Sequence, residues 1–155
     1  MVDVRSYPGS RRHPHFGRAA MEDWLAAAGV AYSWEPRLGG RRKAVPGSRH
    51  TGLTHDAFRA YADHMASPDF AAGVVAVLDL AAASSPTGGV AVMCAESLWW
   101  QCHRRLLADA LVLLHGAAVE HLMPDGRLAP HRPTAAARVE DGSLVYDVGD
   151  TGRLL

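Results

Sequence analysis

Short segments rich in β-branched residues alternate in this chain with longer segments that have helical spacing, and this alternation constrains the fold more than any other feature. Strands are predicted at residues 2 to 5, 31 to 34, 90 to 94 and 119 to 122. Helices are predicted at residues 17 to 28, 54 to 65, 68 to 83 and 98 to 115. We therefore expect an α/β fold, a single three-layer domain over residues 1 to 155 with a mostly parallel sheet and helices on both faces.

Two regions lack a strong pattern. Residues 37 to 53 contain glycine- and proline-bearing turns but no apolar period, so they are predicted to form a long exposed loop. Residues 127 to 155 carry only weak strand signals, at 137 to 139 and 144 to 146. We expect this last region to be a weakly structured C-terminal extension of the same domain.

The size and hydropathy of the chain indicate an ordinary globular protein. With 155 residues, 48% of them hydrophobic, it can bury a core without metal ions or disulfide bonds. No run of 18 apolar residues is present, which argues against a membrane span. The chain begins with Asp3 and Arg5 rather than a basic and then apolar leader, so we expect it in the cytoplasm with both cysteines reduced.

Charge is balanced overall but unevenly distributed. The 16 basic side chains equal the 16 acidic ones in number. Residues 1 to 50 nevertheless carry nine basic and four acidic side chains, so positive charge is concentrated in the first part of the chain. That distribution is suited to an anionic partner.

The run of residues 93 to 105 is the densest group of reactive side chains in the sequence. It lies where a predicted buried strand gives way to a helix, which is where α/β proteins bind ligands. A helix N-terminus and nearby arginines can acidify a thiol in this position and make it a nucleophile. The candidate catalytic residues are Cys94, Glu96 and Cys102. Cys94 could equally be a small buried apolar residue, and Glu96 could simply pair with Arg104.

Four adjacent side chains at the start of the last predicted helix differ in direction. On a helix, Cys102 and His103 would point about 100° apart, which weakens a shared metal site, and we predict no metal ligands. Arg104 and Arg105 differ by the same angle, so at most one should face a pocket. We expect His103 and Arg104 to bind ligand and Arg105 to reach solvent.

Trp99 and Trp100 are further candidates for ligand binding. Either ring could stack on a base or a planar cofactor, or could lie in the core as tryptophan commonly does. No Walker-type glycine loop, dinucleotide fingerprint or serine-nucleophile elbow accompanies them, so the sequence identifies no cofactor.

A second group of candidates follows the first predicted strand. Arg5 ends that strand, so in a parallel sheet it should lie on the same rim as Cys94, with Asp3 holding it in place. The loop after Arg5 and the segment from Arg41 to Lys43 add positive charge. Each basic loop alone is typical of a solvated surface, but together with Arg5 and Arg104 they favour a phosphate, a nucleotide or a nucleic-acid backbone. The candidate ligand-binding residues here are Arg5, Ser6, Tyr7, Arg11, His13 and His15.

The remaining histidines carry less information. His121 lies in a predicted strand and could approach the rim of the sheet. The others follow turns or helix faces and are predicted to be surface groups: His50, His55, His64, His115 and His131.

Five blocks of the sequence form a recognisable combination: Val2 to Pro8, Leu38 to Gly40, Phe58 to Ala62, Met93 to Glu96 and Cys102 to Arg104. In this combination nearly the whole chain closely resembles the bacterial family named domain of unknown function 488. The resemblance implies a single α/β domain whose activity is not established. Members of that family begin with an extra strand and helix that this chain lacks. We therefore expect either a late start or a homo-oligomer in which another chain completes the sheet.

Three functions fit these residues. The first is an enzyme in which Cys94 acts on an anionic, phosphate- or nucleotide-like ligand held by Arg5 and Arg104. The order of its parts is similar to that of rhodanese-like sulfurtransferases, but ten residues separate Cys94 from Arg104, so sulfur transfer is an analogy and enzymatic activity stays open. The second is a nucleotide- or nucleic-acid-binding module without catalysis. The third is a metal or haem protein with cysteine or histidine ligands.

Overall fold

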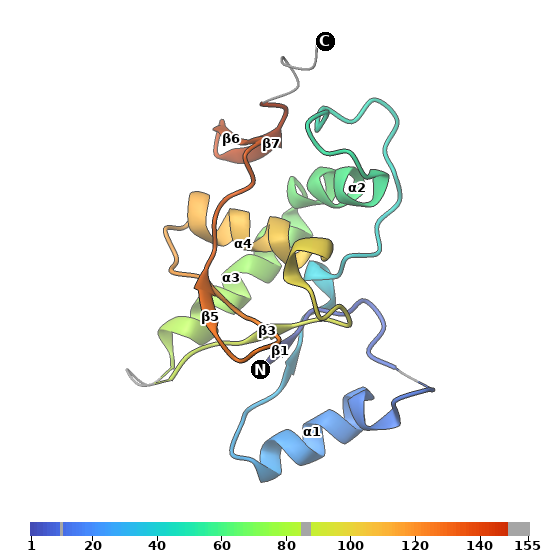
Figure 1. Cartoon of the computed structure of the whole chain (residues 1–155), viewed down its shortest axis with the longest axis vertical. Helices are drawn as coiled ribbons and strands as arrows, with labels where there is room; N and C mark the ends of the chain where they lie inside the picture. The colour runs from blue at the N-terminus through green and yellow to red at the C-terminus, as the bar shows by residue number, and fades with distance from the viewer. Residues whose placement is uncertain (10, 85–87, 149–155) are drawn as a thin grey trace. The chain divides into compact units, whose positions relative to one another are not determined.

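The computed structural model describes residues 1 to 9, 11 to 84 and 88 to 148 of the chain (Figure 1). Helices and strands are both present, and the chain divides into two compact units. Unit 1 comprises Met1–Gly39 and Ala72–Ala95, and unit 2 comprises Gly40–Ala71 and Glu96–Leu155. The α/β character is therefore confirmed.

Unit 1 contains a small parallel sheet. Its strands are β1 (Val2–Asp3), β2 (Ser33–Trp34) and β3 (Val92–Met93), with β1 in the middle. Val2 lies opposite Ser33 on one side and opposite Val92 on the other. The amide of Val4 extends the ladder by donating to the carbonyl of Met93 over 2.9 Å. The predicted positions of these three strands are confirmed, although each strand is shorter than predicted.

The two longest helices of unit 1 bury part of their apolar side chains. The helices of this unit are η1 (Pro14–Phe16), α1 (Arg18–Ala27), η2 (Pro36–Leu38) and the part of α3 (Pro68–Ala82) that follows Ala71. Met21 and Leu25 of α1 are buried, as are Val74 and Val77 of α3. The predicted helices at 17 to 28 and 68 to 83 are confirmed, with Pro68 at the first position of α3, where its missing amide hydrogen costs nothing.

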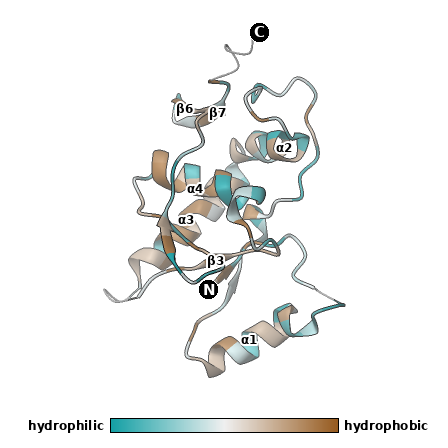
Figure 2. Ribbon diagram, in the orientation of Figure 1, coloured by the Kyte–Doolittle hydropathy of each residue, from teal (hydrophilic) through white to brown (hydrophobic). Residues whose placement is uncertain are grey.

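Unit 2 contains α2 (Asp56–Met65), η3 (Trp99–Gln101), α4 (Arg104–Leu113) and the first residues of α3. Figure 2 shows α3 in pale to brown colours, whereas α2 carries much more hydrophilic teal. Among the described residues no single helix is long and apolar enough to cross a membrane, and α2 and α3 reach that length only as a pair bent by 79°.

The prediction of one continuous helix from 98 to 115 was wrong. A 3-10 turn, η3, comes first, and the backbone at Cys102 is extended, with φ −121° and ψ 151°. The α-helix begins only at Arg104. The break buries the Cys102 side chain, which is 2% exposed, directly before the apolar face of α4.

Two antiparallel hairpins follow α4 in unit 2. Strand β4 (Glu120–Leu122) pairs with β5 (Leu128–Pro130), and β6 (Ala137–Glu140) pairs with β7 (Ser143–Tyr146). Asp141 and Gly142 make the second turn with positive φ angles of 48° and 75°, which suits the right-handed twist of a hairpin. The segment at 119 to 122 therefore does not join the parallel sheet as we expected. The described part of the predicted weak extension, up to residue 148, holds three strands instead.

Of the loop predicted at 37 to 53, residues 39 to 53 form no helix or strand, whereas Arg37 and Leu38 belong to η2, and the segment is not wholly exposed. His50 and Leu53 are each 4% exposed. The Nδ1 atom of His50 accepts a hydrogen bond from the amide of Tyr146 over 3.3 Å, and its Nε2 lies 3.5 Å from Oδ1 of Asp63. The expectation that His50 is a surface group was wrong because β7 supplies it with a buried partner.

Candidate functional site

Arg5 is held by an ion pair just after β1 in unit 1. Its Nε and Nη2 atoms donate to the carboxylate of Asp3 over 2.8 and 2.5 Å, and its Nη1 donates to the carbonyl of Phe16 over 2.8 Å. Asp3 is completely buried and Arg5 is 9% exposed. The prediction that Asp3 holds Arg5 is confirmed. The guanidinium thus uses most of its donors within the protein.

Tyr32 completes this buried group, because its hydroxyl donates to Oδ2 of Asp3 over 2.7 Å. Burial by itself would raise the pKa of Asp3, but the hydrogen bonds from Arg5 and Tyr32 outweigh burial and lower that pKa below its ordinary value. Burial and the hydrogen bond to Asp3 raise the pKa of Tyr32 to about 12. Asp3 is therefore a permanent carboxylate that fixes the Arg5 side chain.

Cys94 leaves the sheet of unit 1 at the same edge as Arg5. It follows β3 directly and is partly exposed. Because β1 and β3 are parallel and Asp3 lies opposite Met93, Cys94 falls opposite Val4, one residue before Arg5. The predicted common rim is therefore present in unit 1.

The residues after Arg5 move from this rim to an exposed loop. Gly39 approaches Ser6 so closely that a Cβ atom on it would lie 2.3 Å from the Ser6 Oγ atom. Tyr7 is 74% exposed. The other predicted ligand-binding residues of this loop, Arg11, His13 and His15, are also exposed, and the rings of His13, His15 and Phe16 contact one another around η1.

Cys102, His103 and Arg104 form a thiol cluster in unit 2. The extended backbone at Cys102 brings its Sγ atom 3.5 Å from Nδ1 of His103. The Nε atom of Arg104 donates to the same sulfur over 3.4 Å. The prediction that Cys102 and His103 point apart was wrong, because it assumed a helix at a position where the chain is extended. One sulfur thus has an imidazole and a guanidinium beside it.

The segment that begins at Gly40 passes directly against this thiol cluster. A Cβ atom on Gly40 would lie 2.3 Å from Nδ1 of His103, so any other residue here would displace the His103 ring. Arg41, Arg42 and Lys43 follow at once. The Nε2 atom of His103 is buried without a hydrogen-bond partner among the described residues. The thiol cluster therefore lies next to a basic segment and contains an imidazole with one nitrogen uncommitted.

Glu96 contacts this region through its backbone. The Nη2 atom of Arg104 donates to the Glu96 carbonyl oxygen, while the residue as a whole is exposed. Arg104 therefore joins the segment after β3 to the start of α4.

A buried network centred on Asp109 of α4 was not predicted. Its Oδ1 atom accepts hydrogen bonds from Nε2 of His131 over 2.8 Å and from the amide of Thr134 over 2.9 Å, and its Oδ2 accepts from the Tyr146 hydroxyl over 3.1 Å. Asp109 is completely buried and His131 is 8% exposed. The expectation that His131 is a surface group was wrong. A carboxylate at a buried helix position was the only sequence signal for this network.

His121 extends the network toward η3. Its Nε2 atom lies 2.8 Å from Nδ1 of His131, and its ring stacks on Trp99 with 3.7 Å between centroids and 1° between planes. Because the Asp109 carboxylate can only accept, Nε2 of His131 is the donor in their contact. Burial, together with the charges of His131 and Arg104, lowers the pKa of His121 to about 4. One face of Trp99 is therefore occupied by a protein side chain.

Arg105 and Trp100 line a cavity in unit 2 with a volume of about 560 Å³. We expected Arg105 to reach solvent and Arg104 to face a pocket. In the structure Arg104 contacts the Cys102 sulfur and Arg105 turns toward the cavity. Arg104 thus lies beside a predicted site residue, whereas Arg105 lines a cavity instead of extending freely into solvent.

The comparison with protein families matches residues 1–111 to the family described as domain of unknown function DUF488. No curated protein and no solved structure matched the chain. The family match includes the Asp3 and Arg5 pair, the thiol cluster and Asp109, and it ends before β4 to β7. Since it covers most of the chain and agrees with the resemblance seen in the sequence, the protein belongs to the DUF488 family.

Proposed function

We propose that the protein is an enzyme that uses a cysteine thiol on an anionic, phosphate- or nucleotide-like ligand. The observation that carries this proposal is the thiol cluster, in which the Cys102 sulfur lies within hydrogen-bond reach of His103 and Arg104. A neighbouring cation favours the thiolate, which is the nucleophilic form of cysteine. An imidazole at the same distance can accept and return a proton.

The expected substrate is anionic because positive charge gathers beside this sulfur. Gly40 lies against His103, so the basic residues that follow it begin next to the thiol cluster. Arg104 belongs to the cluster itself. Arginine presents planar donors that match phosphate and carboxylate oxygens. A small phosphate-bearing molecule is the class that this charge would hold.

Cys94 is the second candidate nucleophile, at the rim that it shares with Arg5 in unit 1. The ion pair with Asp3 uses most of the Arg5 donors, so we assign Arg5 an orienting role at this rim. A thiol mechanism requires reduced cysteines, which favours the cytoplasm as the location of the protein. We further propose that the protein is bacterial and that it folds as one three-layer domain. A homo-oligomer that extends the three-stranded sheet belongs to the same proposal.

Alkylation with two reagents tests the proposal. Iodoacetate is anionic and iodoacetamide is neutral, and both must reach the same buried sulfur, so the ratio of their rates reports charge rather than accessibility. We expect this ratio at Cys102, read by peptide mass spectrometry, to be about tenfold higher than at an ordinary thiol. Inorganic phosphate should protect Cys102, and Arg104→Gln should bring the ratio down.

Cys94 is the matched internal control in the same digest. A high ratio at Cys94 instead of Cys102 would move the nucleophile to the rim of unit 1. Ordinary ratios at both thiols, unchanged by phosphate or by Arg104→Gln, would contradict an anionic substrate at either cysteine. A binding module without catalysis would keep its affinity for a nucleotide in both Cys94→Ser and Cys102→Ser.

Metal binding is a second candidate function that one distance favours. The 3.5 Å between Sγ of Cys102 and Nδ1 of His103 equals the separation of about 3.5 Å that two ligands have on one tetrahedral zinc ion. Addition of Co²⁺ would then give a thiolate charge-transfer band that Cys102→Ser removes. The absence of such a band in the reduced wild-type protein would exclude this alternative.

A further inference from the structure

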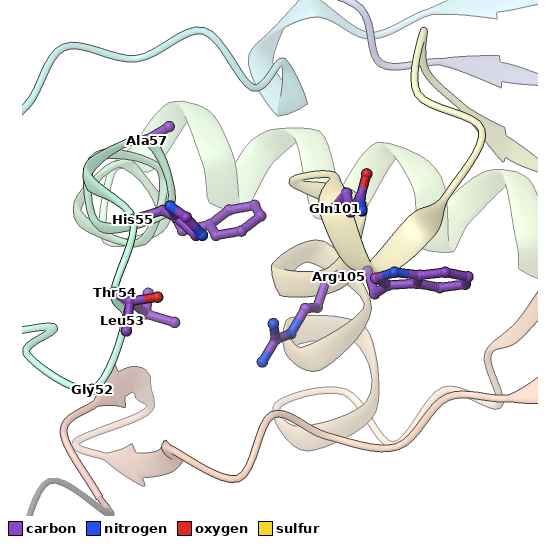
Figure 3. A pocket seen from close by; sticks show the side chains of 9 residues that line it. Gly52, Leu53, Thr54, His55, Ala57, Gln101 and Arg105 are labelled. Carbon is purple, nitrogen blue, oxygen red and sulfur yellow. The ribbon is translucent and has the colours of Figure 1, made fainter.

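A cavity of about 560 Å³ lies within unit 2, apart from the thiol cluster. Its volume is in the range of roughly 300 to 1,000 Å³ that small-molecule sites occupy. The wall combines the segment before α2, the first turn of α2, η3 and the start of α4 (Figure 3). The lining residues are Gly52, Leu53, Thr54, His55, Ala57, Phe58, Trp100, Gln101 and Arg105.

Arg105 is the charged group of this cavity. Its Nε atom donates to Oγ1 of Thr134 over 2.9 Å, and among the described residues neither of its Nη atoms has a hydrogen-bond or ion-pair partner. None of the described residues that line the cavity is an aspartate or a glutamate. Figure 3 shows the Arg105 side chain extending from α4 into the space toward Thr54 and Leu53. The guanidinium is thus anchored at one edge and offers its two other nitrogens to the cavity.

The anchor of Arg105 is itself fixed by buried contacts. Thr134 is 8% exposed, and its amide donates to Oδ1 of Asp109 over 2.9 Å. Asp109 is also held by His131 and Tyr146. A preorganised arginine loses little side-chain entropy when it binds an anion, so the buried network gives Arg105 a fixed geometry for recognition.

The same cavity offers aromatic surface. Trp100 is 40% exposed and lines the cavity together with Phe58. Exposed aromatic faces stack on planar rings. The hydroxyl of Thr54, the imidazole of His55 and the amide of Gln101 add polar groups that can orient a ligand.

We propose that this cavity binds a small ligand that combines a planar ring with an oxyanion. Arg105 binds the carboxylate or phosphate through its Nη atoms, Trp100 stacks on the ring, and Thr134 acts as the positioning residue for Arg105. The proposal does not depend on the chemistry of Cys102.

Calorimetric titration of the full chain tests this site with two anions and their neutral counterparts. Adenosine 5′-monophosphate supplies a phosphate and 2-naphthoate a carboxylate, while adenosine and 2-naphthalenemethanol lack the charge. We expect at least one anion to bind with a Kd below about 1 mM and its neutral counterpart to bind about tenfold more weakly. The anion that binds identifies the oxyanion. Failure of both anions to bind would overturn the proposal.

Variants then assign the residues. Arg105→Gln should weaken anion binding by about 10- to 100-fold, whereas Arg127→Gln, which removes an exposed arginine outside the cavity, should leave it unchanged. Thr134→Val should weaken binding, and Thr134→Ser, which keeps the hydroxyl, should retain it. Trp100→Ala should lose about tenfold in affinity, whereas Trp24→Ala, with a similar 43% exposure on α1, should not.

A measurement on the unaltered protein tests the proposal even if some variants fail to fold. In NMR spectra, the bound anion should shift the Arg105 Nε–H and Trp100 indole N–H signals. Shifts confined to other residues, or equal affinity of wild type and Arg105→Gln, would overturn the proposal.

Discussion

The Nε2 atom of His131 lies 2.8 Å from Oδ1 of Asp109, and both side chains are fully buried. The contact joins α4 to the segment after β5. Through the same carboxylate, Tyr146 of β7 and Thr134 are joined to α4 as well. One buried acid therefore connects the helix that carries Arg105 with both hairpins of unit 2.

Replacing this acid should destabilise the protein strongly. Asp109→Asn turns one acceptor oxygen into a donor facing groups that themselves donate, so we expect a loss of about 3 kcal/mol in the free energy of unfolding in urea. Tyr146→Phe removes only one hydrogen bond and should cost about 1 kcal/mol. Asp79→Asn, at an exposed position of α3, is the control and should change stability little. Equal effects of the Asp109 and Asp79 changes would contradict a buried network.

Stability should fall as the pH decreases from neutral toward 4. His121 has a pKa of about 4 in the folded protein, below the ordinary histidine value of 6.5, so the unfolded chain binds the proton first. The stabilisation is complete above pH 6.5 and is lost as the pH falls toward 4, by at most about 3 kcal/mol. His50, whose pKa burial also lowers, acts in the same direction.

The comparison of urea unfolding at pH 7 and pH 4.5 isolates the His121 contribution. His121→Gln should reduce the difference in the free energy of unfolding between the two pH values. His55→Gln, at an exposed position, should leave that difference as in the wild type. If the free energy of unfolding of His121→Gln fell with pH as steeply as that of the wild type, other groups would control stability in acid.

Loss of the Arg5 ion pair should destabilise the protein far more than loss of a similar ion pair on the surface. Arg5→Leu leaves the Asp3 carboxylate buried with Tyr32 as its one remaining side-chain donor among the described residues, and we expect a loss of about 3 to 5 kcal/mol. Arg18→Leu breaks an exposed pair with Glu22 and should cost less than about 1 kcal/mol. Thermal unfolding of both variants measures the difference. Asp3→Asn combined with Arg5→Leu should recover part of the loss, and a double variant no more stable than Arg5→Leu would count against an unpaired charge.

Local pattern was enough to predict the strands and the α-helices of unit 1, but not η1 and η2. The β-branched residues at Val2 and Val92 mark strands, and these signals act within a few residues of the chain. The shared edge of Arg5 and Cys94 followed because parallel strands end on one side of a sheet.

The site residues of unit 2 could not be predicted in the same way, because tertiary contacts determine them. His121 and His131 meet because β4 and β5 pair, and Asp109 of α4 meets His131 only in the folded chain. The extended backbone at Cys102 interrupts a pattern that is helical on both sides. The expected 100° separation of Cys102 and His103 assumed a continuous helix, so it failed at this interruption.

Gly40→Ala tests whether the close approach to His103 supports the thiol cluster. The added methyl group would lie 2.3 Å from Nδ1 of His103, so the ring must move from the Cys102 sulfur. We expect alkylation of Cys102 at neutral pH to slow several-fold if the imidazole assists the thiolate. Gly9→Ala, where the new methyl group meets open space, is the matched control. Unchanged Cys102 reactivity in Gly40→Ala would argue that His103 has no role in it.

The buried acid at position 109 falls within the part of the chain that matches the DUF488 family, whereas His131, Thr134 and Tyr146, which satisfy it, lie beyond that part. A buried aspartate on this helix would destabilise the fold of any relative without such partners, because burying an unpaired charge costs free energy. We therefore expect aspartate at this position to be inherited together with the two hairpins, and relatives that lack the hairpins to carry a neutral residue there.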